Sequence, residues 1–194
     1  MEVLGASRIL NGFYLAGGTG LALFYGHRMS LDLDFFSREK FNAINVVKAL
    51  KQQGALSIDT LENDTVHGAF EGTKLSLLWY PYKMLKEPVV YNGIQIANPV
   101  DIACMKISAI SSRGTKKDFV DLFYILEHYP LAAIIMFFQE KYEDIGYNMI
   151  HILKSLTYFH DADMDPEPEF LMKNPPAWTA VKRRIQVEVK KLIP

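Results

Sequence analysis

The feature that most restricts the fold of this chain is a pair of adjacent glycines, Gly17 and Gly18, between two apolar segments. Residues 13–16 predict a short buried strand, and Thr19 begins a helical run that continues to Tyr25. Glycines at a strand-to-helix turn let the backbone approach a ligand closely, and the first N–H groups of the helix lie unpaired at the positive end of its dipole. The pattern therefore predicts that Gly17, Gly18 and Thr19 bind phosphate.

Two aspartates, Asp32 and Asp34, follow in a segment where polar and apolar residues alternate. In an extended strand both carboxylates lie on one face, while Leu33 and Phe35 lie on the other. Carboxylates about 7 Å apart repel each other unless a cation lies between them, and Mg²⁺ prefers such hard oxygen ligands. Either pattern alone is more often a plain turn or a solvated strand edge. Together they predict a phosphate-binding turn beside a magnesium site, and so chemistry on a nucleoside triphosphate.

Length and composition exclude several classes of protein. The chain has 194 residues, which suits one domain or a compact domain with a helical appendage. A net charge of −1 argues against a broadly basic surface, so we expect any nucleic-acid contact to be local, without recognition of a DNA sequence. The one cysteine, Cys104, suits a reducing cytoplasm. No apolar run approaches the ~20 residues of a membrane span, so we expect a cytoplasmic protein without membrane contact.

The order of the expected elements predicts a mixed front half and a helical rear half. Residues 1–97 predict an α/β (α+β) core with a small mixed sheet, and residues 98–194 predict an α-helical part packed on that core. An Asn-Gly pair, Asn92-Gly93, predicts a tight hairpin. The other expected elements are a helix over 42–53, strands over 55–61, 65–71 and 73–80, and helices over 98–114, 115–127, 131–143, 148–158 and 177–192.

A second group of charged residues occupies the first helices of the rear half. On a helix Lys106 and Arg113, which are seven residues apart, face the same way at the rim of an apolar surface. Cationic groups of this kind offset the charge of a triphosphate that metal ions leave uncovered. The residues of this group are Asp101, Lys106, Arg113, Lys117, Asp118 and Asp121.

The acidic members of this group permit two interpretations. Thr115 and Asp118 have the spacing of a capping box, and Lys117 can pair with Asp121 one helical turn later. In that interpretation the charges only stabilise a helix and its surface. In the other, Asp118 and Asp121 share a face that belongs to a binding site. Spacing alone does not separate the two.

A resemblance to a known family is carried by four segments, which are Leu15-Ala16-Gly17-Gly18-Thr19, Gly26-His27-Arg28-x-Ser30-x-Asp32-Leu33-Asp34-Phe35-Phe36-Ser37, Asp101-x₄-Lys106 and Arg113-x₃-Lys117-Asp118-x₂-Asp121. They resemble motifs of the AbiEii/AbiGii toxin family of nucleotidyltransferases, within the DNA polymerase β-type superfamily. The family is known from abortive-infection, or type IV toxin–antitoxin, systems. The resemblance implies a nucleotidyltransferase-like fold and Mg²⁺-dependent transfer of a nucleoside monophosphate from a triphosphate to an acceptor hydroxyl.

The resemblance also implies roles for individual residues and partners. A nucleoside triphosphate is the implied substrate, with transfer RNA as the acceptor in some members, and a separately encoded antitoxin protein restrains the toxin. Two Mg²⁺ ions are the implied cofactors. The implied metal ligands are Asp32 and Asp34; the implied catalytic residues are Asp32, Asp34, Asp118 and Asp121; and the implied nucleotide-binding residues are Gly17, Gly18, Thr19, Lys106, Arg113 and Lys117.

One departure from the superfamily pattern bears on catalysis. The superfamily normally supplies a third carboxylate from a neighbouring strand, and in the strand expected over 73–80 Ser76 takes that place. Alternation assigns Trp79 to the buried face of this strand and Ser76 to the other face. Two alternatives follow. Either Asp118 or Asp121 deprotonates the acceptor, or the protein is a regulatory module that binds nucleotide with impaired transfer.

Three further groups of polar residues receive structural interpretations. Residues 160–166 begin like a calcium loop, but Pro166 replaces the required glycine, so we expect a solvated loop. The basic residues around Arg183 predict the outer face of a docked terminal helix rather than an RNA contact. His27 and Arg28 follow the first helical run, where cations interact favourably with the helix dipole.

Overall fold

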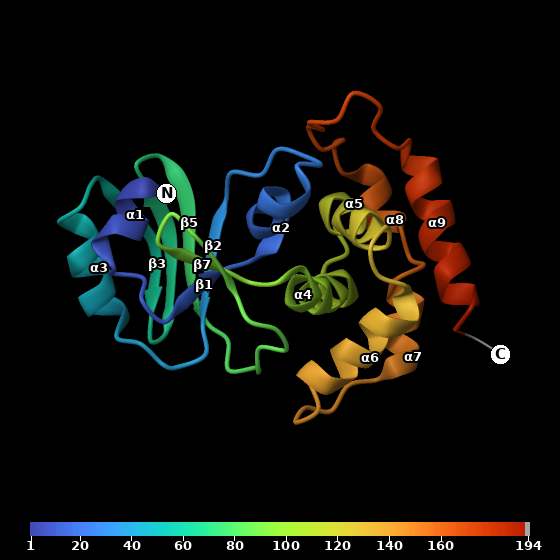
Figure 1. Cartoon of the computed structure of the whole chain (residues 1–194), viewed down its shortest axis with the longest axis horizontal. Coiled ribbons are helices and arrows are strands. Elements are labelled where there is room, and N and C mark those ends of the chain that lie inside the picture. Colours follow the sequence, from blue (N-terminus) through green and yellow to red (C-terminus); the bar gives the residue numbers. More distant parts are fainter. Residues whose placement is uncertain (193–194) are drawn as a thin grey trace. The chain divides into compact units, whose positions relative to one another are not determined.

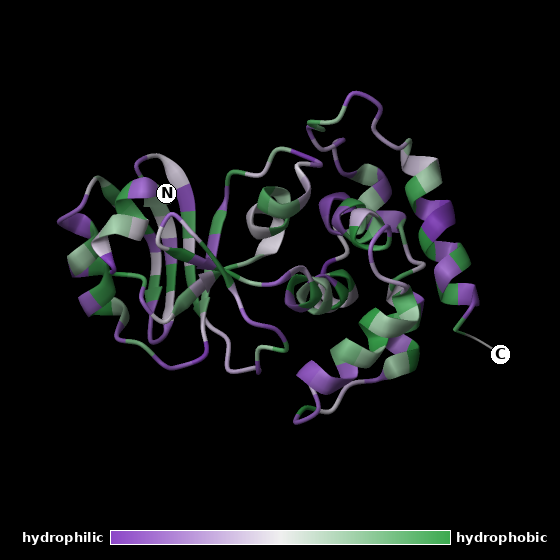
Figure 2. Ribbon diagram, viewed as in Figure 1, coloured by the Kyte–Doolittle hydropathy of each residue, from purple (hydrophilic) through white to green (hydrophobic). Residues whose placement is uncertain are grey.

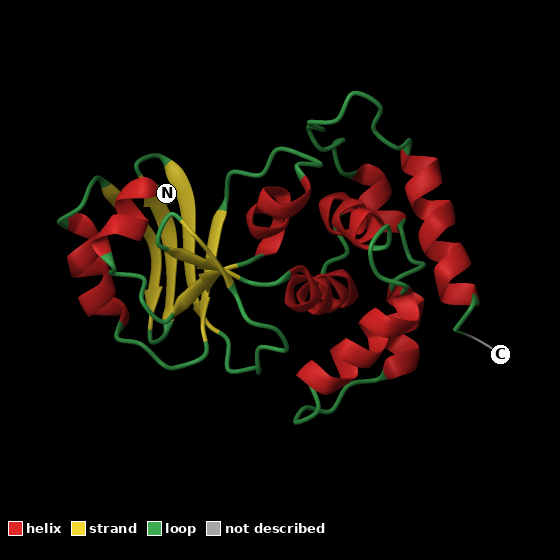
Figure 3. Cartoon of the chain, viewed as in Figure 1, coloured by secondary structure: helices red, strands yellow, loops and turns green. Residues whose placement is uncertain are grey.

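A computed structural model of the chain describes residues 1–192 and divides it into two compact units. The first unit contains residues 1–20 and 30–98, and the second contains residues 21–29 and 99–194. Helix α2 (Gly17–Tyr25) is therefore divided between the units. The strands belong to the first unit, and the part from residue 99 onward consists of helices joined by loops (Figure 3). This mixed α/β architecture confirms the predicted fold class.

The first unit is built on a seven-stranded mixed sheet with the strand order β3-β4-β5-β2-β1-β7-β6. Five of these strands, β1, β2, β3, β5 and β7, are labelled in Figure 1. Strand β1 runs antiparallel to β2 and parallel to β7, and β2 runs parallel to β5. The remaining neighbours are antiparallel hairpins. The strands are β1 (Phe13–Leu15), β2 (Leu33–Ser37), β3 (Leu56–Glu62), β4 (Thr65–Phe70), β5 (Thr73–Trp79), β6 (Val89–Tyr91) and β7 (Ile94–Ile96).

One face of this sheet forms the core of the first unit. A row of directly paired residues crosses four strands on that face, and each of its side chains is fully buried: Leu15, Phe35, Leu77 and Val66. The same apolar cluster includes residues of α1 (Glu2–Ser7) and α3 (Ala43–Lys51). Since side chains alternate along a strand, the residues between these apolar positions point to the opposite face, which carries polar residues such as Asp34 and Ser76 beside the aromatic pair Tyr14 and Phe36.

Two hairpin turns have the left-handed backbone that tight turns require. Asn92 and Gly93 have φ of 48° and 77°, and they join β6 to β7 as the Asn-Gly pair predicts. Glu71 and Gly72, with φ of 49° and 74°, join β4 to β5 in the same way. These turns set the registers of the β6–β7 and β4–β5 hairpins.

The second unit packs its helices around α4 and α5. Helix α4 contacts α5, α6 and α7, and α5 contacts α8 and α9. A buried ion pair joins Lys141 of α6 to Asp101 of α4, at 2.6 Å. The helices are α4 (Pro99–Ser112), α5 (Lys116–Ile125), α6 (Leu131–Lys141), α7 (Met149–Ser155), α8 (His160–Met164) and α9 (Trp178–Lys190).

Helix α9 is docked along one side, as the sequence predicts. Val181, Ile185 and Val189 are buried, and Arg183 and Arg184 are exposed. The alternation between apolar and charged turns of α9 is visible in Figure 2. No helix within residues 1–192 is both long enough and apolar enough to cross a membrane.

Some expectations about elements were wrong. Residues 160–164 form helix α8 rather than a solvated loop, because Asp163 accepts hydrogen bonds from Trp178 and Lys182 of α9. Trp79 is 41% exposed rather than buried, since it ends β5, where its indole N–H donates to the carbonyl of Arg38. Helix α2 begins at Gly17, two residues before the expected start at Thr19.

Candidate active site

The glycine pair forms the turn from β1 into α2, as predicted. Gly17 has φ of 64°, in the left-handed region that favours glycine. A Cβ atom at this position would lie 3.1 Å from Oδ2 of Asp34, so the carboxylate of Asp34 lies directly against the turn. The backbone N–H of Ala16 donates to the carbonyl of Asp34 at 3.0 Å, which fixes the turn to β2. The start of the helix and the aspartate strand are therefore held together by backbone and by close contact.

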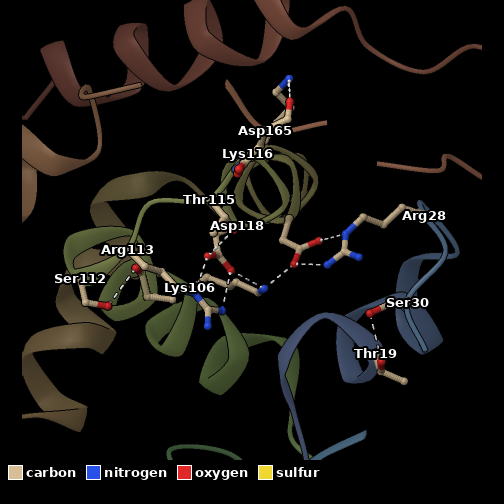
Figure 4. Close-up of polar contacts among 12 residues, drawn as sticks. Thr19, Arg28, Ser30, Lys106, Ser112, Arg113, Thr115, Lys116, Asp118 and Asp165 are labelled. Atoms are coloured by element: carbon tan, nitrogen blue, oxygen red, sulfur yellow. Dashed lines mark hydrogen bonds and ion pairs between the residues drawn. The ribbon is translucent and has the colours of Figure 1, made fainter. Parts of the chain in front are cut away.

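Thr19 connects the same turn to the segment before β2. Its hydroxyl donates to the carbonyl of Asp32 at 2.5 Å and also forms a 3.0 Å hydrogen bond with the hydroxyl of Ser30 (Figure 4). Thr19 is buried, so this hydroxyl is committed to holding the Asp32 segment. What Thr19 can offer a phosphate is its backbone N–H, in the first turn of α2.

The two aspartates differ in their surroundings. Asp34 lies within β2 and is half-buried, whereas Asp32 precedes the strand and is exposed, so only Asp34 has the predicted strand position. Within residues 1–192 no three His, Cys, Asp or Glu side chains are grouped so as to hold a metal ion. Mg²⁺, however, commonly takes one or two carboxylates and completes its shell with water and substrate phosphates. Two aspartates beside the glycine turn at the start of α2 fit this mode of binding.

A row of polar residues crosses the sheet beside Asp34. Asp34 of β2 is paired with Ser76 of β5, and Ser76 is paired with His67 of β4. Directly paired residues point to the same face, so Ser76 occupies the position next to Asp34 that the sequence assigned to the missing carboxylate. Nδ1 of His67 lies 3.2 Å from Oγ of Ser76. The sequence interpretation missed His67; its place in the alternating pattern of residues 65–70 was the available signal.

In the second unit, charged side chains form a buried network between α4 and α5. The ammonium of Lys106 lies 2.9 Å from Oδ1 of Asp118 and 2.5 Å from Oδ2 of Asp121. All three residues are buried. Burial lowers the pKa of Lys106, but the two carboxylates outweigh it, so its pKa is raised above the ordinary value. Lys106 is therefore a fixed cation held between two anions.

Asp121 collects further donors from the segment that follows α2. Arg28 donates from Nε to Oδ1 at 2.7 Å and from a terminal nitrogen to Oδ2 at 2.8 Å. His27 lies 2.7 Å away, with Nε2 facing Oδ1. Burial raises the pKa of Asp121, but Lys106, His27 and Arg28 together lower it well below the ordinary value. The sequence interpretation placed His27 and Arg28 at a helix end and in a family motif, but it missed their bonds to Asp121, which span 94 and 93 residues.

Asp118 is equally committed to partners. Burial raises the pKa of Asp118, but Lys106 and Arg113 outweigh burial, and the pKa is lowered. Thr115 is the N-cap residue of α5, yet its hydroxyl donates to the Asp118 carboxylate at 2.8 Å instead of capping the helix (Figure 4). The expected capping box was therefore wrong in its hydrogen bonds. The expected pairing of Lys117 with Asp121 was also wrong, because Lys117 is exposed and Asp121 bonds Lys106, Arg28 and His27.

The structure thus distributes the predicted site residues over two groups. The first unit brings together the glycine turn and the two aspartates, and it adds Ser76 and His67. The second unit brings together Lys106, Arg113, Asp118 and Asp121, and it adds His27 and Arg28, while Lys117 stays on the surface of α5.

Comparisons with known proteins agree with this architecture. The family described as "Nucleotidyl transferase AbiEii toxin, Type IV TA system" matches residues 2–74 and 75–191. An uncharacterized protein of Aquifex aeolicus (strain VF5) is 36% identical over 191 residues, which cover 95% of this chain and 90% of that protein. The crystal structure of JHP933 from Helicobacter pylori superposes with a TM-score of 0.57 at 20% identity, covering 98% of this chain and 89% of the other. At this identity the likeness shows a common fold. Since the family match extends over almost the whole chain, the protein belongs to the AbiEii family of nucleotidyl transferase toxins of type IV toxin–antitoxin systems.

Proposed function

We propose that the protein is a Mg²⁺-dependent nucleotidyltransferase that transfers a nucleoside monophosphate from a triphosphate to an acceptor hydroxyl. The observation that carries the proposal is the position of the Asp34 carboxylate, against Gly17 at the first residue of α2. A helix N-terminus binds phosphate, and a carboxylate there would repel it unless a cation lay between them. A metal–triphosphate complex satisfies both groups at once.

Each residue of the first unit has a distinct part in this proposal. Gly17, Gly18 and Thr19 direct their backbone N–H groups at the phosphates. Asp32 and Asp34 would hold the metal ions and would thereby orient the α-phosphate. Bound Mg²⁺ would supply Lewis-acid polarisation of the phosphoryl oxygens and neutralise charge that develops on the leaving group.

For the acceptor and the biological partner, family membership supplies the support. We propose an RNA hydroxyl, transfer RNA first, as the acceptor, and a separately encoded antitoxin protein as the partner that restrains the activity. We place this activity in the cytoplasm. The acceptor proposal is compatible with a net charge of −1, because an RNA end needs only a local contact.

We propose a different role for the charged network of the second unit. Both oxygens of Asp121 and both oxygens of Asp118 accept hydrogen bonds from cationic or hydroxyl donors. Carboxylates with lowered pKa and occupied oxygens are poor proton acceptors, so we propose that these two residues hold Lys106 and Arg28 in place rather than act as the base. Triphosphate binding by Lys106, Arg113 and Lys117 stays a prediction; the Arg113 side chain, 65% exposed, is open to a ligand.

A second candidate function is a regulatory module that binds nucleotide without transferring it. The observation that favours it is Ser76, which stands beside Asp34 where a third carboxylate is normal. Transfer assays separate the two candidates, because only an enzyme moves label from the triphosphate to an acceptor.

The test uses α-labelled ribonucleoside triphosphates, Mg²⁺ and total RNA. We expect the wild type to label RNA, and we expect Asp32→Asn and Asp34→Asn each to abolish both labelling and Mg²⁺-dependent triphosphate binding while the protein stays folded. Asp59→Asn is the matched control, since Asp59 is an exposed aspartate on β3 of the same sheet. Unchanged triphosphate affinity in both site variants would refute the metal assignment. Tight binding by a wild type that labels nothing would establish the regulatory module instead.

A further inference from the structure

Ser76, which stands in the place of the third carboxylate, has a neighbour that the superfamily pattern does not predict. His67, Ser76 and Asp34 are consecutive members of one row across β4, β5 and β2, all on the face of the sheet opposite the apolar core row. The bond of 3.2 Å between Nδ1 of His67 and Oγ of Ser76 joins β4 to β5, the middle strand of the row. An imidazole is therefore coupled through one hydroxyl to the position beside the metal-binding aspartate.

A histidine in this position can do what a carboxylate does. Imidazole is the side chain best suited to accept a proton near neutral pH, and a hydroxyl bonded to it can relay that proton. Asp118 and Asp121 of the second unit are the other candidates for the base, but both already accept hydrogen bonds from cations. By contrast, His67 is half-buried, and its side chain is hydrogen-bonded to the neutral hydroxyl of Ser76.

We infer that His67 and Ser76 together replace the third carboxylate and remove the proton from the acceptor hydroxyl, an inference that rests on the proposed transferase function. In this step the acceptor oxygen forms a bond to the α-phosphorus, and the bond from that phosphorus to the pyrophosphate oxygen breaks. Pyrophosphate leaves with the bonding electron pair. The acceptor proton passes to Oγ of Ser76 as the proton of Ser76 passes to Nδ1 of His67, which requires the tautomer with its proton on Nε2.

The first variant separates the role of His67 in proton transfer from its role in the structure. Asn matches the reach of Nδ1 and can keep the hydrogen bond to Ser76, but an amide does not accept a proton at neutral pH. We expect His67→Asn to keep its melting temperature and triphosphate affinity, and to lose transfer to total RNA by about 10² or more, the usual worth of a general base. A His67→Asn enzyme with wild-type transfer would overturn the inference.

Two rescue experiments complete the test. Added imidazole should restore transfer to His67→Ala and leave the wild type unchanged, because a free base can enter the space left by the ring. Ser76→Asp should restore transfer in the His67→Asn background, because it supplies the missing carboxylate directly. Failure of both rescues in folded protein would overturn the inference. If the wild type transfers label and Asp34→Asn does not, the proposed function stands whatever the His67 variants do, so the two failures remain distinguishable.

Discussion

Gly17 is subject to two separate constraints, one from its backbone and one from its neighbour. Its φ of 64° strains any residue that carries a side chain, and a Cβ atom would approach Oδ2 of Asp34 to 3.1 Å. The first constraint belongs to the turn and the second to the site. Gly26 offers a comparison, since it has φ of 58° but no heavy atom within 4 Å of a Cβ.

The pair of variants Gly17→Ala and Gly26→Ala separates stability from function. Both should lose about 1–2 kcal/mol of unfolding free energy, the usual strain of an L-residue in left-handed backbone. Only Gly17→Ala should also lose triphosphate binding, because its methyl group pushes the Asp34 carboxylate from the turn. Denaturant unfolding and calorimetric titration check the two quantities. Equal triphosphate affinity in the two variants would mean that Gly17 is only a structural turn.

Individual residues were predicted well where the signal was local. The Asn92-Gly93 hairpin and the position of Ser76 both follow from short-range patterns in turns and strand alternation. His67 was missed because its bond to Ser76 depends on which strands pair, which a single strand does not reveal. The error at Trp79 has a similar cause. Alternation assigns a residue to a face of the sheet, but it does not show how far along the strand other residues cover that face.

Helices α4 and α5 are joined by charged contacts as well as by apolar packing. The ammonium of Lys106 bridges Asp118 and Asp121 where water has little access. Removing one partner of a buried ion pair leaves the others uncompensated, and this usually costs more than the pair itself contributes.

Lys106→Met tests the network against a matched change on the neighbouring helix. It should lower the unfolding free energy by about 3–5 kcal/mol, because two buried carboxylates lose their shared cation. Lys117→Met, an exposed lysine on α5, should change it by no more than about 0.5 kcal/mol. Chemical denaturation of both variants measures the difference. Similar stabilities would show that the network contributes little to folding.

At the level of elements, the sequence predicted most helices and strands but not what the charged residues of α4 and α5 contact. Helix periodicity correctly put Asp118 and Asp121 on one face, where both meet Lys106. The remaining partners of Asp121 are His27 and Arg28, which lie 94 and 93 residues earlier in the chain, so no local pattern reports them. Long-range polar contacts of this kind appear only in the folded structure.

The charged network between α4 and α5 should make the stability of the whole molecule depend on pH. The pKa values of Asp118 and Asp121 are lowered in the folded state, so their contribution is complete above the ordinary value of 3.8 and is lost as pH falls through the lowered values. The pKa of Lys106 is raised, so its contribution is complete below 10.5 and is lost as pH rises beyond the raised value.

We therefore expect the unfolding free energy to fall steeply on the acid side, below about pH 4. Asp121→Asn should be less stable than the wild type at neutral pH. Its unfolding free energy should fall less on acidification, since one of the two carboxylates with a lowered pKa is gone. Urea unfolding of both proteins across the acid range is the measurement. An acid slope that is identical in wild type and Asp121→Asn would assign the pH response to other groups.

The short segment around Arg28 has a consequence for the order in which the chain folds. The Arg28 side chain donates hydrogen bonds to Asp121, and the Arg28 backbone pairs with Phe170. The backbone N–H of Met29 donates to the carbonyl of Glu169. During synthesis, residues 27–29 leave the ribosome long before any of these partners exist. The contacts of Arg28 and Met29 with residues 169 and 170 thus form only after residue 170 has been translated, so a chain interrupted before that point lacks them.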